Sequence, residues 1–286
     1  MNEVEDADRA ARLRELLERQ CVGDDPIVVV GMHRSGTTLL AQILSAAGVY
    51  TGSRLSGNHE PRLFQDANRQ VLDYFGASWC HVDPVPAAEV LWSGFAGLRR
   101  TIGDRLVQDL PTMFFDQLRP GQTVWGWKDP RNCLTAPVYA RLLPNARAVF
   151  IHRHPAPVIR SLRVRDHRLR QKWPASDATW ASACPAISDE QAMRLWEIYN
   201  RNAVTAIAYF TRSYTLSYEN LLRDPVREVS SMFNALGLAS NNEFASLAAL
   251  VRREAASGPL DRAEGESLAQ GSPTYSRLYL PGVPAA

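Results

Sequence analysis

The sequence contains no stretch that approaches the roughly 18 uncharged apolar residues of a membrane-spanning helix. Its first twenty residues are rich in Asp, Glu and Arg and contain no apolar run, so they fit neither a signal peptide nor a membrane anchor. The formal net charge is only +2, which is too small to indicate nucleic acid or an anionic membrane as the main partner. We therefore expect a cytoplasmic protein that neither spans a membrane nor binds nucleic acid.

Cysteines are few, and they lie far apart, at Cys21, Cys80, Cys133 and Cys184. The sequence has no C-x-x-C motif and no repeated Cys/His spacing, so we expect reduced structural thiols and no zinc site. The run Cys80-His81 with Asp83 offers three potential metal ligands. Three polar residues in a proline-rich segment indicate a loop more often than a metal site, so no metal is predicted.

The composition is that of a globular protein. The chain has 286 residues, of which 45% are hydrophobic and 22% charged, which is enough to bury a large core. We expect a single domain over residues 1–286, with its core at about 26–240 and an amphipathic surface helix at 6–20. The tail from about residue 255 is rich in Gly, Ser and Pro, and we expect it to order only over a bound ligand.

Short apolar runs alternate with longer segments of helical spacing. The runs typical of buried strands are 27–30, 124–127, 148–151 and 214–218. Helices are predicted at 37–47, 62–74, from about 157, from a capping box at 188–191 to about 210, and at 225–236. Residues 76–122 predict two or more helices. This alternation predicts an α/β fold, with a central, mostly parallel sheet flanked by helices.

The turn after the first predicted strand has the composition of an anion-binding loop. It consists of Gly31, Met32, His33, Arg34, Ser35, Gly36, Thr37 and Thr38. Glycines at 31 and 36 lack the Cβ atoms that would obstruct an anion, and the N–H groups of the following helix favour negative charge. We therefore predict a phosphate or sulfate site here, although an ordinary strand–turn–helix remains an alternative.

The spacing G-x-x-x-x-G-Thr-Thr nearly matches a nucleotide P-loop, but Thr37 stands where the P-loop has its lysine. The cation is instead inside the loop, at Arg34. Kinases use that lysine, and a hydroxyl that binds the metal ion, to stabilise the charge of a multiply charged phosphate. A P-loop nucleotide kinase or other phosphotransferase is therefore disfavoured but kept as an alternative, as is a non-catalytic nucleotide-binding protein.

Charged residues also follow the other predicted strands. Lys128-Asp129-Pro130 follows the second strand, and Arg153 follows the third with Ser161 eight residues later. Carboxyl ends of parallel strands share one edge of a sheet, where ligands bind. The guanidinium of an arginine and a side-chain hydroxyl on a helix can form hydrogen bonds to a phosphate from two sides. The basic stretch 160–172 is equally consistent with a solvated face and with an anion site.

Four stretches in this order resemble the motifs of sulfotransferases that use 3′-phosphoadenosine-5′-phosphosulfate (PAPS). They are the loop 31–38, the segment 128–130, the pair Arg153 and Ser161, and the strand-terminal segment 218–225. Arg34, in place of the lysine of the cytosolic small-molecule enzymes, and the Lys-Asp-Pro segment resemble the tyrosylprotein branch. The resemblance implies a P-loop-like three-layer fold, PAPS as cofactor with 3′,5′-ADP as product, and no metal.

The resemblance also implies roles for these residues. The loop 31–38 would bind the 5′ end of PAPS, while Arg34 and Lys128 would stabilise charge on the transferred group. Arg153 and Ser161 would bind the 3′-phosphate, and Tyr218 would lie in the cofactor site. The acceptor would be a small molecule, glycan, lipid or peptide that offers a hydroxyl or, less favourably, an amine.

The sequence departs from the family pattern in two respects: the catalytic base, and the segment that covers the 3′-phosphate of the cofactor. The histidine base of the cytosolic enzymes has no convincing counterpart in this sequence. The resemblance to the tyrosylprotein branch, which has a glutamate base, implies Glu60 as the base. His59 is the immediate alternative, and Asp66 is a weaker one. Glu60 could also simply favour the start of the helix at 62 electrostatically. The Gly-rich C-terminal motif of the family is not evident, and Arg277 is the candidate to cover the 3′-phosphate.

Overall fold

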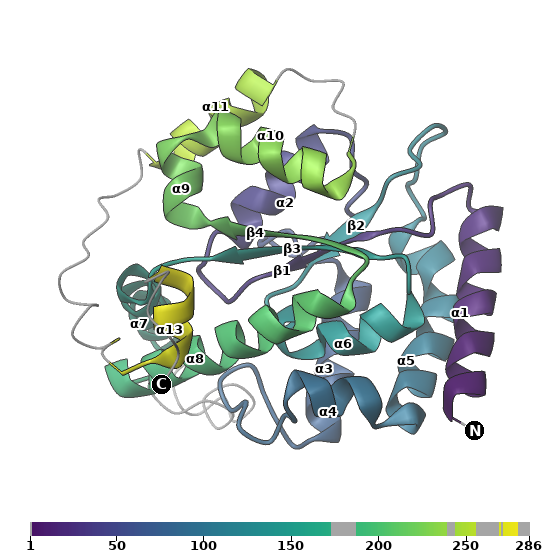
Figure 1. Cartoon of the computed structure of the whole chain (residues 1–286), viewed down its shortest axis with the longest axis horizontal. Helices are drawn as coiled ribbons and strands as arrows, with labels where there is room; N and C mark the ends of the chain where they lie inside the picture. Colours follow the sequence, from purple (N-terminus) through teal and green to yellow (C-terminus); the bar gives the residue numbers. More distant parts are fainter. Residues whose placement is uncertain (1, 173–186, 239–243, 256–268, 270, 280–286) are drawn as a thin grey trace.

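The computed structural model of the chain describes residues 2–172, 187–238, 244–255, 269 and 271–279. Its centre is a sheet of four parallel strands in the order β2-β1-β3-β4 (Figure 1). The strands are β1 (Ile27–Val30), β2 (Gly126–Lys128), β3 (Arg147–His152) and β4 (Arg212–Ser217). Because every pairing is parallel, the carboxyl ends of all four strands meet at one edge. This confirms the predicted parallel sheet.

Helices cover both faces of the sheet (Figure 1). One face carries α1 (Asn2–Arg19), α3 (Arg62–Tyr74), α4 (Ala88–Ser93), α5 (Ala96–Asp109), α6 (Asn132–Leu142) and α8 (Asp189–Ala206), with the short helices η1 (Leu110–Phe114) and η2 (Ile207–Tyr209). The other face carries α2 (Thr37–Ala46), α9 (Tyr218–Arg223), α10 (Pro225–Leu236) and α11 (Phe244–Ala255). In the described part of the chain, no helix is both long and apolar enough to cross a bilayer.

The strands separate two hydrophobic cores because successive side chains point to opposite faces. Val28 and Val30 of β1 pack into the larger core, with α1, α3, α5, α6 and α8. Ile27 and Val29 pack into the smaller core, with α2, α10 and α11. The strand is apolar throughout because both of its faces are buried. The result is the predicted three-layer α/β arrangement.

The element boundaries differ from the predictions in places. The second strand begins at Gly126 rather than at residue 124, and the fourth ends at Ser217, so that Tyr218 opens α9. The long helix predicted to reach residue 210 ends at Ala206 and tightens into η2, although its capping box at Ser188 is confirmed. The segment that follows the basic stretch, residues 173–186, lies outside the described residues.

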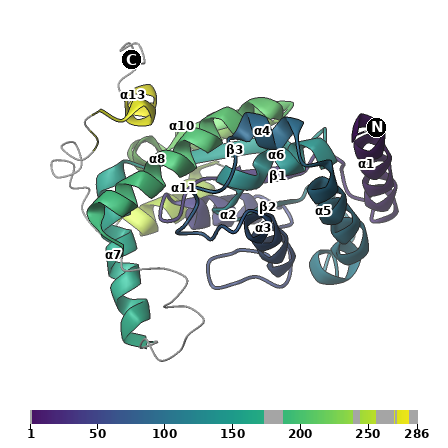
Figure 2. The ribbon, with the colours of Figure 1, turned by 90° about the horizontal axis from the view of Figure 1, so that it is seen from below.

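Two elements lie at the carboxyl edge of the sheet, α7 (Pro155–Lys172) and α13 (Pro273–Tyr279). The helix α7 projects from the body of the molecule (Figure 2). The helix α13 is docked: the Tyr279 hydroxyl lies 2.9 Å from His152 Nδ1, and the Tyr275 hydroxyl lies 3.2 Å from His154 Nε2. This part of the tail therefore forms a helix that packs on the residues at the end of β3.

The cysteines also differ from expectation. Cys21 and Cys133 are free, as predicted, but Cys80 is disulfide-bonded. The prediction of reduced thiols is therefore wrong for Cys80. Its sequence surroundings give no pairing signal, because it lies far from every other cysteine in the chain.

Candidate active site

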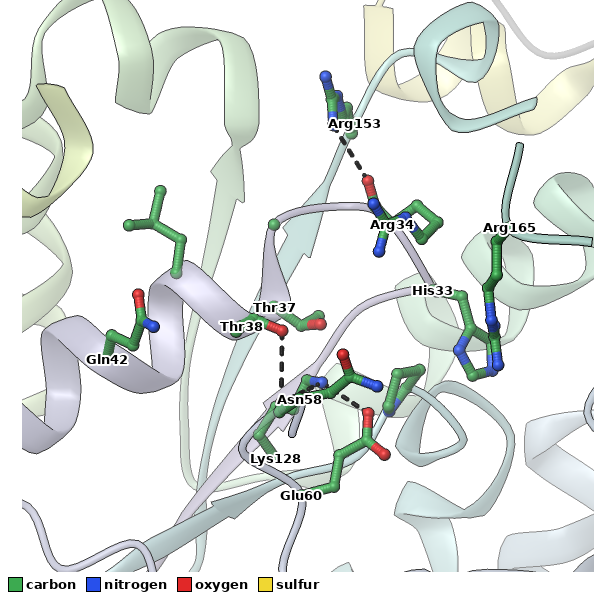
Figure 3. A pocket seen from close by; sticks show the side chains of 13 residues that line it. His33, Arg34, Thr37, Thr38, Gln42, Asn58, Glu60, Lys128, Arg153 and Arg165 are labelled. Atoms are coloured by element: carbon green, nitrogen blue, oxygen red, sulfur yellow. Dashed lines mark hydrogen bonds and ion pairs between the residues drawn. The ribbon is translucent and has the colours of Figure 1, made fainter. Parts of the chain in front are cut away.

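A cavity of about 380 Å³ lies at the carboxyl edge of β1, β2 and β3 (Figure 3). It is lined by His33, Arg34, Gly36, Thr37, Thr38, Leu39, Gln42, Asn58, Glu60, Lys128, Pro130, Arg153 and Arg165. The strand order places β1 between β2 and β3, so the chain leaves β1 where the sheet connections change direction. In open α/β sheets such a position forms a ligand crevice.

The loop between β1 and α2 turns its backbone through two left-handed residues, Arg34 with φ 69° and Gly36 with φ 92°. No side chain caps the N-terminus of α2. Alternating left-handed residues curl successive N–H groups toward one side and form an anion-binding concavity. The loop therefore combines backbone donors with the positive end of a helix dipole.

The two loop glycines are required by packing. A Cβ on Gly31 would lie 2.6 Å from the Ile151 carbonyl oxygen and 2.7 Å from Thr37 Cγ2. A Cβ on Gly36 would lie 2.4 Å from the Tyr218 ring. The sequence interpretation attributes both glycines to the approach of an anion. In the structure, their immediate role is to let the loop pack against β3 and α9.

Gly36→Ala is expected to destabilise the protein by about 2–5 kcal/mol, because left-handed strain adds to overlap with Tyr218. Gly48→Ala is the matched control. Its φ is 95°, but no atom lies within 4 Å of the point that an added Cβ would occupy, so it should lose only about 1–2 kcal/mol. Urea unfolding measures both changes. Equal losses would show that the Tyr218 contact adds nothing.

At the floor of the cavity, Lys128 and Glu60 form a buried ion pair with Nζ–Oε1 at 2.7 Å. Their side chains are 3% and 10% exposed. Lys128 Nζ also donates to the Asn58 carbonyl oxygen at 3.0 Å, and Gln65 Nε2 donates to Glu60 Oε2 at 2.6 Å. Burial lowers the pKa of Lys128, whereas the Glu60 carboxylate raises it. The predicted base and one predicted cation are thus in direct contact.

Lys128 and Glu60 both retain unused hydrogen-bonding capacity. An ammonium has three donors, and Lys128 uses two of them within the described residues, on Glu60 and Asn58. A carboxylate has about four acceptor positions, and Glu60 uses one on each oxygen, for Lys128 and Gln65. Each side chain can therefore bind one more group in the cavity.

A second cluster brings together Arg34, Arg153 and Ser161 (Figure 3 shows the first two). Arg34 Nε donates to Ser161 Oγ at 2.6 Å, and Arg153 Nη1 donates to the Arg34 carbonyl oxygen at 3.2 Å. The Arg153 guanidinium lies 4.3 Å from the centre of the Tyr218 ring. Trp196 Nε1 donates to the Arg153 carbonyl oxygen at 2.9 Å. The loop 31–38, the Arg153–Ser161 pair and the segment 218–225, which are separate in the sequence, are therefore neighbours.

The remaining predicted residues lie around this cavity or away from it. His59 has φ 58° and its Nε2 lies 3.3 Å from Gln42 Nε2, and it is not among the lining residues. Ser35 is buried behind the loop. Asp66 pairs with arginines, including Arg62 at 3.5 Å, and is also absent from the lining. Arg277 is exposed on α13 and does not line the cavity.

His33 lines the cavity, and its ring packs edge-on against Trp79 and Tyr199, with centroids at 5.2 and 5.7 Å. Burial lowers its pKa well below the usual value, and Arg165 is the largest of several cations that lower it further. The imidazole is therefore neutral at pH 7. Its packing makes His33 a wall of the cavity.

The sequence interpretation does not single out Arg165 as a lining residue and includes it only in the basic stretch 160–172. Arg165 follows Ser161 by four residues on α7, and that spacing places both on one face of a helix. This spacing is the signal that could have found it. Trp79 gives none, because it lies in irregular backbone before α4.

Comparison with known proteins identifies the family. Residues 26–242 match the model of the sulfotransferase family. The sulfotransferase domain from the curacin biosynthetic pathway shares 16% sequence identity and a TM-score of 0.50, covering 86% of this chain and 96% of that one. A sulfotransferase from Mycobacterium tuberculosis H37Rv shares 16% identity and a TM-score of 0.51, covering 86% of this chain and 75% of that one.

At such identities, the structural likeness shows the fold alone, which is the predicted P-loop-like α/β fold. No curated protein matches the chain in sequence. The family match, in contrast, spans most of the chain and includes the loop 31–38, Lys128 and Arg153. The chain therefore belongs to the sulfotransferase family.

Proposed function

We propose that this sulfotransferase uses PAPS as donor and transfers its sulfuryl group to an acceptor hydroxyl or, less favourably, an amine. The observation that carries the proposal is the convergence of the loop 31–38, Lys128 and Arg153 on one cavity, where Arg34 of the loop also donates to Ser161. These residues come from separate motifs, and each supplies hydrogen-bond donors suited to sulfate or phosphate oxygens. The acceptor would be a small molecule, glycan, lipid or peptide.

The residues at the cavity fit the anionic ends of such a donor. Arg153 has no carboxylate partner within the described residues, and its buried Nε has no hydrogen-bond acceptor there. The uncapped N-terminus of α2 adds backbone donors. We propose that the loop and Lys128 hold the 5′-phosphosulfate, and that Arg153, Ser161 and the adjacent Tyr218 hold the 3′-phosphate end.

PAPS, when bound, supplies the sulfuryl group and leaves as 3′,5′-ADP. In the proposed mechanism, Arg34 and the remaining donor of Lys128 stabilise the negative charge that develops on the oxygens of the transferred group. Glu60 accepts the proton of the attacking hydroxyl through an oxygen position that Lys128 and Gln65 leave open. Lys128 thus holds the base in place and also acts on the reacting group. His59 remains the alternative base.

The direct test is incubation with sulfur-labelled PAPS and a panel of sugars, phenols, lipids and peptides. We expect label transfer to at least one acceptor, with 3′,5′-ADP formed in equal amount. ATP should not replace PAPS, and EDTA should leave transfer unchanged. Failure of the protein to bind 3′,5′-ADP, together with binding of ATP, would contradict the proposal and favour a nucleotide kinase.

Arg153→Met is expected to weaken binding of 3′,5′-ADP by roughly 10- to 100-fold, because a hydrogen bond to a charged group contributes about 1.5–3 kcal/mol. Binding of 5′-AMP, which lacks the 3′-phosphate, should be nearly unchanged. Methionine keeps an aliphatic stem over Tyr218. Calorimetry measures both ligands, and Arg168→Met on the exposed side of α7 is the control. Equal weakening of both ligands would show that Arg153 does not recognise the 3′ position.

A further inference from the structure

Arg165 differs from the other cations of the cavity in what it contacts. Lys128 is paired with Glu60, Arg34 donates to Ser161, and Arg153 donates to a backbone carbonyl. Arg165 lies 4.6 Å from the centre of the Trp79 ring. Within the described residues, it has no hydrogen-bonded or ion-paired acceptor. An aromatic face orients a guanidinium without neutralising its charge.

The surroundings of Arg165 increase its affinity for an anion. The side chain is half-buried and lines the cavity. Burial lowers its pKa, and the nearby Arg34 lowers it further. Both effects oppose the charged form of Arg165, which an arginine nevertheless keeps at pH 7. The attraction of an anion bound in the cavity would offset both.

The Trp79 ring supports one face of the Arg165 guanidinium. Trp79, on which it stacks, is anchored because the Tyr199 hydroxyl donates to its carbonyl oxygen at 2.8 Å. The neutral His33 ring packs against both aromatic rings. A planar guanidinium supported in this way matches the two oxygens of a carboxylate or phosphate. The geometry is therefore that of a recognition site, prepared before a ligand arrives.

The position of Arg165 separates it from the proposed donor contacts. Figure 3 shows Arg165 and His33 on one side of Arg34, and Thr37 and Thr38 on the other. The helix that begins at Thr37 is the proposed site of the 5′-phosphosulfate. Glu60 and Lys128 lie at the floor between the two sides. An acceptor whose hydroxyl reaches Glu60 can therefore extend toward Arg165.

We propose that Arg165 binds an anionic group of the acceptor, a carboxylate or a phosphate, while the acceptor hydroxyl lies at Glu60. This inference rests on the proposed function. It narrows the acceptor class to acidic alcohols and phenols. Arg165 is then a specificity-determining residue, and neutral alcohols of the same shape bind poorly because the guanidinium remains without an acceptor.

The test compares three phenols that differ in one group: 4-hydroxybenzoate, 4-hydroxyphenyl phosphate and methyl 4-hydroxybenzoate. Calorimetry measures their binding to the enzyme saturated with 3′,5′-ADP. We expect the wild type to bind at least one of the two acids about 10-fold or more tightly than the ester. Whichever acid binds more tightly identifies the anionic group of the acceptor as a carboxylate or a phosphate. Arg165→Met should abolish the preference, with 3′,5′-ADP binding retained as the sign of an intact fold.

Arg163→Met is the matched control. It removes the same charge from α7 at an exposed residue that pairs with Asp189 at 3.1 Å, and it should keep the preference for the acid. The inference is overturned if the wild type shows no preference, including no binding of any probe, or if the preference persists in Arg165→Met. A 10-fold loss of 3′,5′-ADP affinity in Arg165→Met would also overturn it, by placing Arg165 in the donor site. If the wild type fails to bind 3′,5′-ADP before any phenol is added, the proposed function itself has failed.

Discussion

Lys128→Met is expected to lower kcat by about 10²- to 10³-fold, the usual loss when one donor that stabilises transition-state charge is removed. The third N–H of Lys128 has no acceptor within the described residues, and the side chain lines the cavity. Charge on the reacting oxygens grows as the sulfur–oxygen bond breaks. Binding of 3′,5′-ADP should therefore change much less than turnover. Steady-state kinetics and calorimetry measure the two effects separately.

The same substitution should also reduce stability, because it leaves the Glu60 carboxylate buried without its partner. Breaking one side of a buried ion pair costs about 3–5 kcal/mol. The double variant Glu60→Gln/Lys128→Met removes both charges and should recover part of this loss in urea unfolding. Turnover of Lys128→Met within threefold of the wild type, with the fold intact, would show that Lys128 has a structural role only.

The fold can be predicted from the sequence because each strand is an apolar run that ends at polar residues. Ile27–Val30 is buried on both faces and follows Pro26, which marks the start of the strand. The strand ends deliver Arg34, Lys128 and Arg153 to one edge, because parallel strands share their carboxyl side. The location of the site therefore follows from the order of the strands and from the charged residues that succeed them.

The contacts within the site could not be predicted in the same way. Lys128 and Glu60 lie 68 residues apart, and their pairing depends on the path of an irregular loop with a left-handed residue at His59. The ring of Trp79 also comes from irregular backbone, between α3 and α4. The disulfide at Cys80 has no local signal. Long-range pairing and loop conformation, rather than local propensity, determine these features.

The ion pair changes the argument for Glu60 as base. A carboxylate at a helix start could have been only an electrostatic cap, but Glu60 precedes the cap residue, Pro61, and points toward Lys128. Figure 3 shows its carboxylate facing into the cavity beside Asn58. Its carboxylate keeps acceptor positions that Lys128 and Gln65 leave open. A hydroxyl that binds at one of these positions lies within hydrogen-bond reach of Glu60 and can transfer its proton to the carboxylate.

Glu60→Gln is expected to lower kcat by about 10²-fold or more, because the amide keeps the shape of the carboxylate but cannot accept a proton. Its oxygen can still accept from Lys128, and Gln65 can rotate its amide to present an oxygen to the new NH₂ group. Binding of 3′,5′-ADP should remain close to that of the wild type, which separates loss of the base from loss of the donor site.

His59→Ala provides the matched comparison, because His59 is adjacent in sequence and is the alternative base. Its Nε2 lies near Gln42, and the side chain does not line the cavity, so turnover should stay within a few-fold of the wild type. Rapid-quench measurement of a single turnover with saturating PAPS and acceptor isolates the chemical step from product release. A near-normal rate in Glu60→Gln, paired with an inactive His59→Ala, would transfer the role of base to His59 and leave the Glu60–Lys128 pair as a device that positions the lysine.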